Sequence, residues 1–154
     1  MPTLGQWALH KEKVMEEEKI MPEGCQLIDI PSVVDARGSL AFAESLGCVP
    51  FPIARVFWIY DVPFGMQRGG HAHWSCTEVV VAVRGAFTMV VDDGRVRSEI
   101  RMDSPSRGIL IPAGVWCELR DFASDSLLVV MASEPYDATG YVHNYEEYLK
   151  AKRG

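Results

Sequence analysis

Residues 65–85 read GMQRGGHAHWSCTEVVVAVRG, and this stretch decides the fold. Two of the chain's four histidines, His71 and His73, stand two positions apart in it. On an extended strand, residues i and i+2 point to the same face, so both imidazole rings project together while Ala72 turns away. Because a buried imidazole needs hydrogen-bond partners, two on one face indicate a functional site rather than a structural pair.

The segments around this stretch have the pattern of a β-protein. From residue 25 onward, short apolar runs alternate with glycine, proline and aspartate at intervals of about 8–12 residues. The run ARVFWIYDV (54–62) is rich in branched and aromatic residues, and Arg-Gly at 84–85 joins two apolar runs as a hairpin turn would. The pattern predicts about nine strands in a sandwich or barrel, followed by a short C-terminal helix in YEEYLKAKRG (145–154).

The bulk properties limit the class of protein. A chain of 154 residues predicts one domain, here residues 25–154, with residues 1–24 as an N-terminal extension. The net charge of −6 argues against a nucleic-acid partner, because phosphate contacts need clustered lysine and arginine. No apolar run approaches the roughly 20 residues that span a bilayer, so we expect no membrane. Four cysteines without a CxxC pair, and no secretory pattern at the start, predict reduced thiols and a cytoplasmic protein.

The stretch quoted above resembles the first signature motif of the cupin superfamily, G-x5-H-x-H-x3-4-E-x6-G, with Glu78 and Gly85 at its last two positions. Residues 112–117, PAGVWC, resemble the second motif, P-x-G-x2-H, with Cys117 at the histidine position. The resemblance implies an all-β fold, the cupin double-stranded β-helix or jelly roll, which agrees with the strand pattern.

In metal-binding cupins the motif residues hold a metal ion. If a metal binds here, the resemblance implies His71, His73, Glu78 and Cys117 as its ligands, and thiolate and imidazole suit zinc or iron. Cys117 is equally compatible with a small buried hydrophobic residue, and Glu78 with a partner that fixes a histidine tautomer without any metal. A metal-dependent cupin enzyme therefore remains an alternative.

The segments RGGHAH (68–73), DARGSLAFAE (35–44) and YVHNYEEYL (141–149) resemble one cupin branch, the WxcM-like dTDP-4-oxo-6-deoxyglucose 3,4-ketoisomerase family. The resemblance extends over about residues 26–149. It implies an enzyme without a cofactor that moves the ketone of a dTDP-linked keto sugar from C4 to C3 in deoxyamino-sugar biosynthesis. It also implies a homodimer with exchanged N-terminal strands.

The same resemblance implies that His71 and His73 are the catalytic pair. His71 would remove the C3 proton to give an enediol and return a proton at C4, and His73 would orient His71 or move a proton between O3 and O4. An imidazole is suited to this at neutral pH. Arginine forks match diphosphate oxygens, and aromatic rings stack on a base or sugar. The predicted substrate-binding residues are Arg37, Arg55, Tyr60, Arg68, Trp74, Trp116 and Cys117.

Further interpretations stay open at this point. The protein would be a non-catalytic cupin if the histidine pair only hydrogen-bonds a sugar. A 3,5-epimerase of dTDP-sugars uses a similar barrel, but the close histidine pair favours ketone migration. His143 is interpreted as structural or exposed, and His10 as exposed. The sequence does not fix the configuration of the product at C4 or the identity of the nucleotide.

Overall fold

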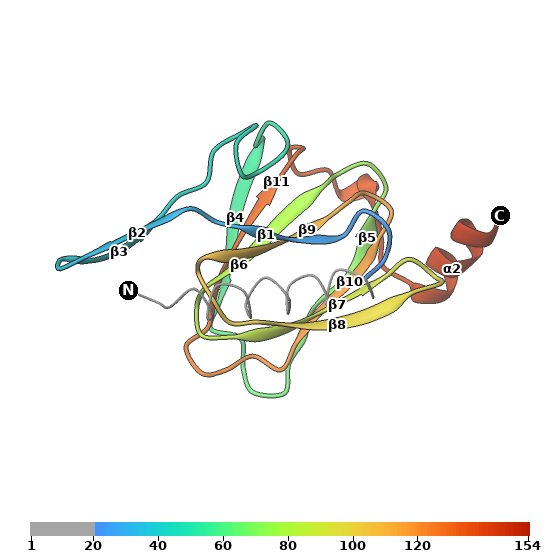
Figure 1. The fold of residues 1–154 in the computed structure, drawn as a ribbon. Helices are drawn as coiled ribbons and strands as arrows, with labels where there is room; N and C mark the ends of the chain where they lie inside the picture. Colours follow the sequence, from blue (N-terminus) through green and yellow to red (C-terminus); the bar gives the residue numbers. More distant parts are fainter. Residues whose placement is uncertain (1–20) are drawn as a thin grey trace.

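The computed structural model describes residues 21–154 and shows two five-stranded sheets that face each other (Figure 1). Of the predicted N-terminal extension, residues 1–24, the first 20 lie outside the described residues. The strands are β1 (Gln26–Asp29), β2 (Ser32–Asp35), β3 (Gly38–Ala41), β4 (Arg55–Tyr60), β5 (Arg68–His73), β6 (Glu78–Arg84), β7 (Phe87–Asp92), β8 (Arg97–Met102), β9 (Arg107–Ile111), β10 (Trp116–Arg120), β11 (Leu127–Ala132) and β12 (Tyr141–Val142). A 3-10 helix, η1 (Ala138–Gly140), and an α-helix, α2 (Tyr145–Arg153), complete the described elements.

The two sheets have the strand orders β1-β9-β6-β11-β4 and β12-β5-β10-β7-β8. Their strand pairs are antiparallel. Side chains alternate between the two faces of each strand, as in β8, where Ser98, Ile100 and Met102 are buried and the residues between them are exposed. The inward-facing residues form one apolar core between the sheets. The predicted all-β jelly roll is confirmed.

The valine run of β6 shows why this strand lies in the middle of its sheet. Val80 and Ala82 pack into the core between the sheets, whereas Val79 and Val81 pack into a second cluster on the outer face. The segment before β4 covers that outer face with Val49 and other apolar residues. A strand that is buried on both faces reads as a continuous apolar run, because neither face needs polar residues.

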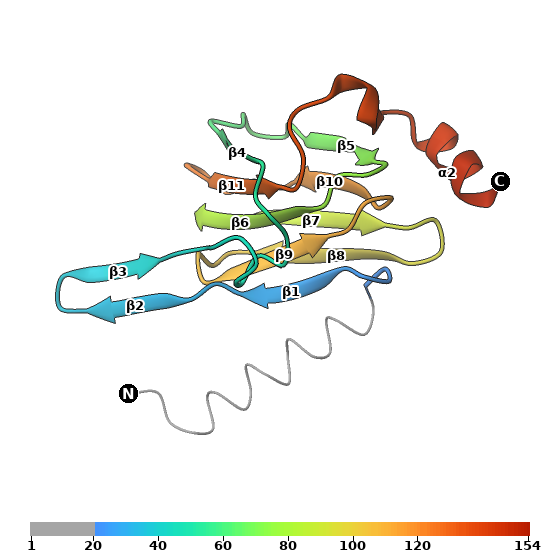
Figure 2. The ribbon, with the colours of Figure 1, turned by 90° about the horizontal axis from the view of Figure 1, so that it is seen from above.

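The hairpin of β2 and β3 extends away from the two sheets (Figures 1 and 2). All eight of its strand residues are exposed, including Val33, Val34 and Leu40. Arg37 lies at the turn, where its guanidinium pairs with Asp35 at 2.7 Å. Isolated two-stranded hairpins are only marginally stable in water, and exposed apolar patches of this kind often mark interaction surfaces.

Helix α2 confirms the predicted C-terminal helix and covers the outer face of β5 and β10. Asn144 caps its first turn by accepting a hydrogen bond from the backbone of Glu147. Tyr148 is fully buried against Ala72 and Trp116, and its hydroxyl contacts the carbonyl oxygens of Asp92 and Gly114 at 2.9 and 2.7 Å. Between residues 21 and 154, no helix is long and apolar enough to cross a membrane.

The turn between β6 and β7 offers a test of the fold. Gly85 has a φ of +74°, and a Cβ there would lie 2.4 Å from Oγ and 2.8 Å from Cα of Ser126. We expect Gly85→Ala to lower the free energy of unfolding by roughly 3 kcal/mol. Urea unfolding would show this as a lower midpoint, with an unchanged slope of the unfolding free energy against urea concentration. Gly140→Ala is the control, because no heavy atom lies within 4 Å of its added Cβ. Equal losses in both variants would contradict this prediction.

Candidate active site

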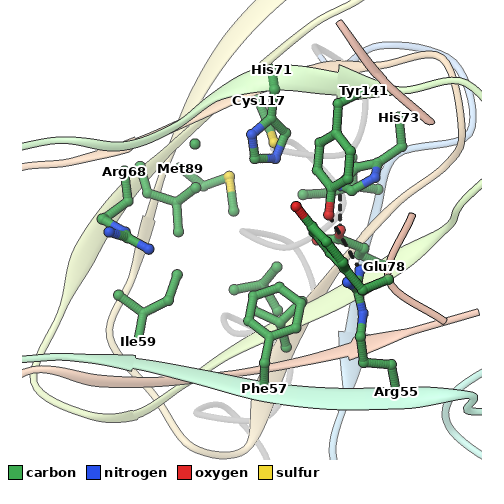
Figure 3. Close-up of a pocket in the computed structure, with 16 residues that line it drawn as sticks. Arg55, Phe57, Ile59, Arg68, His71, His73, Glu78, Met89, Cys117 and Tyr141 are labelled. Atoms are coloured by element: carbon green, nitrogen blue, oxygen red, sulfur yellow. Dashed lines mark hydrogen bonds and ion pairs between the residues drawn. The ribbon is translucent and has the colours of Figure 1, made fainter. Parts of the chain in front are cut away.

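A cavity of about 410 Å³ opens between the two sheets (Figure 3). This volume falls in the range of small-molecule sites. The first sheet lines the cavity with Arg55, Phe57, Ile59, Glu78, Val80, Ile111 and Val130, the second with Arg68, Gly69, His71, His73, Met89, Cys117, Leu119 and Tyr141, and the loop after β11 with Tyr136. The walls are mostly apolar, and the polar groups are concentrated on the side of β5 and β12.

The two histidines of β5 project into the cavity together, as predicted from their spacing (Figure 3). Their ring centroids lie 5.0 Å apart, and the ring planes are nearly perpendicular at 81°. Ala72 between them turns outward and is fully buried. Gly69 precedes the pair with a φ of +75°, opposite a break in the register between β5 and β10. A Cβ at Gly69 would meet Leu119 at 2.9 Å, so the close approach of these strands requires glycine.

Glu78 holds His73 from the facing sheet. Its Oε1 lies 2.5 Å from Nε2 of His73, and both side chains are more than nine-tenths buried. The two atoms are in ion-pair contact, but they are not aligned as a hydrogen bond. Glu78 therefore contacts a histidine, as the metal-free interpretation of this residue predicted, and it fixes the position of the His73 ring.

The environment of His71 favours its neutral form. Burial in the cavity wall lowers the pKa of His71 from 6.5 to about 4, with further lowering from His73, His143 and Arg68, while Glu78 works in the opposite direction. Loss of water contact penalises the charged imidazolium more than the neutral ring. At neutral pH, His71 is therefore an unprotonated imidazole with a free nitrogen that can accept a proton.

Two arginines carry positive charge into the cavity. Arg55 comes from β4 and Arg68 from β5, and they lie on opposite sides of the cavity (Figure 3). Burial disfavours the charge on Arg55, but a 3.5 Å hydrogen bond to the Tyr141 hydroxyl and the nearby Cys76 and Glu78 outweigh this, so its pKa is raised. A cavity with a fixed guanidinium at each side is suited to an anionic ligand.

The tyrosine Tyr141 is part of the site although the sequence did not indicate it. It lies on β12, which pairs with β5 so that Tyr141 is opposite His73. Its ring centroid is 4.2 Å from that of His73 and 5.1 Å from that of His71. Exposed His143 stacks on Tyr141 at 5.5 Å and meets the edge of His71 at 5.9 Å. A strand of two residues carries no periodicity, so only its pairing with β5 places Tyr141 in the cavity.

Besides Arg37, three of the predicted substrate-binding residues do not line the cavity. Tyr60 follows the inward-facing Arg55, Phe57 and Ile59 on β4, so it points to the opposite face and is 60% exposed. Trp116 precedes the inward-facing Cys117 and therefore packs outward under α2. Trp74 lies on the same outer side, where its ring stacks on Tyr148. These side chains do not line the cavity because neighbouring strand residues face opposite ways, and their part in substrate binding stays a prediction.

Trp116 has a structural role instead. Its indole nitrogen donates to Glu118, which also pairs with Arg97. Arg97 in turn pairs with the buried Asp92, which accepts a hydrogen bond from the hydroxyl of Tyr145 on α2. The predicted binding residue is thus part of the network that fastens the C-terminal helix to the outer face of β10.

The conditional metal-ligand set also requires a correction. Within residues 21–154, the donor atoms close enough to hold one ion belong to His73, Cys76 and Glu78, whereas His71 and Cys117 are outside this group. Cys117 does line the cavity, and its burial raises the pKa of the thiol, which therefore stays protonated. Arg37, in the turn between β2 and β3, does not line the cavity of its own chain.

Comparisons with known proteins place this geometry in a family. Residues 23–153 match the FdtA family, described as WxcM-like, C-terminal. The chain belongs to this family. It is 38% identical over 125 residues to TDP-4-oxo-6-deoxy-alpha-D-glucose-3,4-oxoisomerase of Aneurinibacillus thermoaerophilus. The matched region covers 81% of this chain and 90% of that protein.

Solved structures of 3,4-ketoisomerases have the same fold. A 3,4-ketoisomerase from Helicobacter canadensis superposes with a TM-score of 0.83 at 32% identity, covering 85% of this chain and 98% of that one. QdtA, a sugar 3,4-ketoisomerase from Thermoanaerobacterium thermosaccharolyticum in complex with TDP, superposes with a TM-score of 0.84 at 32% identity, covering 86% and 97%.

The lowered pKa of His71 has a kinetic consequence. If His71 accepts a proton during turnover, kcat/KM falls only when the pH drops far enough to protonate it in the free enzyme. Because burial depresses this pKa to about 4, we expect the acidic limb of the kcat/KM profile to lie below pH 6.5, the ordinary value for histidine. Steady-state rates across the acidic range would measure it, and an acidic limb at or above the ordinary value would contradict the prediction.

Proposed function

We propose that this protein is a sugar-nucleotide 3,4-ketoisomerase that moves the ketone of dTDP-4-oxo-6-deoxyglucose from C4 to C3. The pair of inward-facing imidazoles in a mostly apolar cavity carries the proposal. Family membership and the named activities of the relatives support it. The product is a 3-keto sugar, which suits a following step that adds an amino group at C3, so the protein acts in deoxyamino-sugar biosynthesis.

The geometry supports a proton-transfer route through an enediol. Unprotonated His71 removes the proton from C3, which is acidic because it lies next to the C4 ketone. Electrons move to form the C3=C4 bond, O4 gains a proton, and the enediol then loses the proton of O3 as C4 is protonated. The net change exchanges the ketone and hydroxyl positions: C3 is oxidised and C4 is reduced within one molecule, so no external oxidant or reductant is needed. His73, fixed by Glu78, and Tyr141 are the groups close enough to His71 to carry the proton between O3 and O4.

The charges of the cavity support binding of the nucleotide diphosphate. Arg55 and Arg68 provide the cationic groups, and guanidinium forks pair with phosphate oxygens. The protonated thiol of Cys117 adds a small apolar surface beside His71. Four free thiols agree with a reducing compartment, which supports a cytoplasmic setting.

Turnover by histidine variants tests the catalytic proposal. Wild-type protein dialysed against EDTA should convert dTDP-4-oxo-6-deoxyglucose, followed by NMR, at the rate of the undialysed protein. His71→Asn and His73→Asn should each lower kcat by about 10²–10⁴-fold, the usual contribution of general acid–base catalysis. Arg95→Gln is the control, because Arg95 is exposed on the turn after β7 and does not line the cavity.

The alternatives predict other outcomes. Activity that EDTA abolishes and a single metal restores would establish a metal-dependent cupin enzyme instead. Thermal stabilisation by dTDP without any product would establish a non-catalytic sugar-binding cupin. Full activity in both asparagine variants would contradict the assigned roles of the two histidines.

The exposed hairpin supports a homodimer with exchanged N-terminal strands. The described residues expose an apolar surface on the β2–β3 hairpin and another on the outer face of β4 and β6, where Val56, Trp58 and Val83 are 49%, 61% and 43% exposed. Two such surfaces can cover each other in a symmetric pair of chains. The hairpin then carries Arg37 to a second copy, where it contributes to the substrate site of that copy.

A mixing experiment tests whether Arg37 acts in the neighbouring chain. Arg37→Ala should lower kcat/KM by about 10- to 100-fold, the value of a hydrogen bond between charged groups. When the Arg37→Ala and His71→Asn chains are unfolded, mixed and refolded together, activity should return to roughly a quarter of wild type, because half of the dimers are mixed and each holds one complete site.

The negative outcome is equally clear. If Arg37 serves its own chain, or no substrate at all, the mixture has no more activity than the two variants apart. Arg95→Ala removes an exposed arginine on the turn after β7, serves as the matched substitution and should leave kcat/KM unchanged.

A further inference from the structure

Three buried donors of different chemistry converge behind the wall of the cavity. His73 ends β5, Glu78 begins β6, and Cys76 lies in the turn between them. A nitrogen of His73, the Cys76 sulfur and a carboxylate oxygen of Glu78 all lie within 4.8 Å of one another. The three residues are 8%, 6% and 6% exposed. Cys76 itself does not line the cavity, so the group is reached through His73 and Glu78.

Two of these donors have unused capacity. Nε2 of His73 and Oε1 of Glu78 are buried without a hydrogen-bond partner, although they are in ion-pair contact with each other. The Cys76 sulfur has only long contacts, 3.7 Å to the carbonyl of Thr77 and 3.9 Å to the hydroxyl of Ser133. Buried polar atoms are normally satisfied, so these two atoms leave room for a further partner.

The donor set suits a thiophilic divalent cation. Thiolate, imidazole and carboxylate are the three protein ligands of zinc, and three of them leave a fourth position open. Binding would displace the thiol proton, and the two negative charges of Cys76 and Glu78 would offset the ion. The positive charge of Arg55 works against binding of a cation, since Arg55 lies near both Cys76 and Glu78. An ion between His73 and Glu78 would also have to open their 2.5 Å contact.

We propose that His73, Cys76 and Glu78 form an inhibitory zinc site in this protein. The inhibitory part rests on the proposed function, because it assumes that His73 takes part in isomerisation. The ion occupies the nitrogen of His73 that faces Glu78 and so removes both the proton carrier and its positioning partner. Zinc therefore stops turnover without competing for the place of the sugar beside His71.

Cobalt binding tests the site without reference to turnover. Cobalt(II) added to the metal-free full-length protein should give a thiolate-to-cobalt charge-transfer absorption, saturate at one ion per chain and be displaced by zinc. Cys76→Ser should lose this absorption and weaken zinc binding by at least roughly tenfold. Cys48→Ser, a half-buried thiol away from the site, and Cys117→Ser should keep it.

Turnover then tests the consequence. Zinc should inhibit wild type, and in Cys76→Ser the zinc concentration for half-inhibition should rise at least roughly tenfold, each variant being compared with its own metal-free rate. X-ray absorption of zinc-loaded wild type should show one sulfur among nitrogen and oxygen ligands, which keeps the test valid if Cys76→Ser folds poorly.

Each failure has a distinct meaning. No cobalt–thiolate absorption, no sulfur ligand, or an absorption lost in Cys117→Ser but kept in Cys76→Ser would overturn the site. Zinc binding without inhibition would contradict the proposal that zinc on His73 stops turnover. Cobalt binding at Cys76 with no turnover of the dTDP-sugar by metal-free protein would leave the site in place and contradict the proposed function instead.

Discussion

The antiparallel pairing of β5 with β10 and β12 is the constraint on which the site depends. It holds a strand of six residues so that His71 and His73 face the cavity and Ala72 faces the helix α2. The outward side is a packed layer, in which Ala72 is fully buried against Trp116 and Tyr148. A shift of the register by one residue would turn both imidazoles into that layer. The C-terminal helix therefore stabilises the active face from behind without touching it.

The cavity combines two opposing electrostatic demands. Its apolar walls keep His71 neutral and able to accept a proton, whereas Arg55 and Arg68 supply the positive charge that a diphosphate needs. Burial makes the largest contribution to the lowered pKa of His71, and Arg68 makes only a small one.

The sequence predicted the parts of this site that follow from strand periodicity and missed those that depend on pairing. The spacing of the two histidines placed both rings correctly. The same alternation of side chains along a strand predicts that Trp116 faces away from Cys117. Tyr141 was not predictable in this way, because a two-residue strand has no pattern of its own and its position depends on hydrogen bonds to β5.

Residues 73–78 show a second limit of sequence reasoning. The cupin spacing pointed to Cys117 as the thiol that would join the histidines, since both motifs contribute ligands in metal-binding relatives. The turn between β5 and β6 instead brings Cys76 to His73 and Glu78. An irregular turn obeys no simple period, so its side-chain directions depend on the two strands that it joins. Oε1 of Glu78 contacts Nε2 of His73, and in the proposed zinc site the same oxygen would share an ion with that ring. The direct contact and the proposed ion exclude each other, because the ion would have to separate these two atoms.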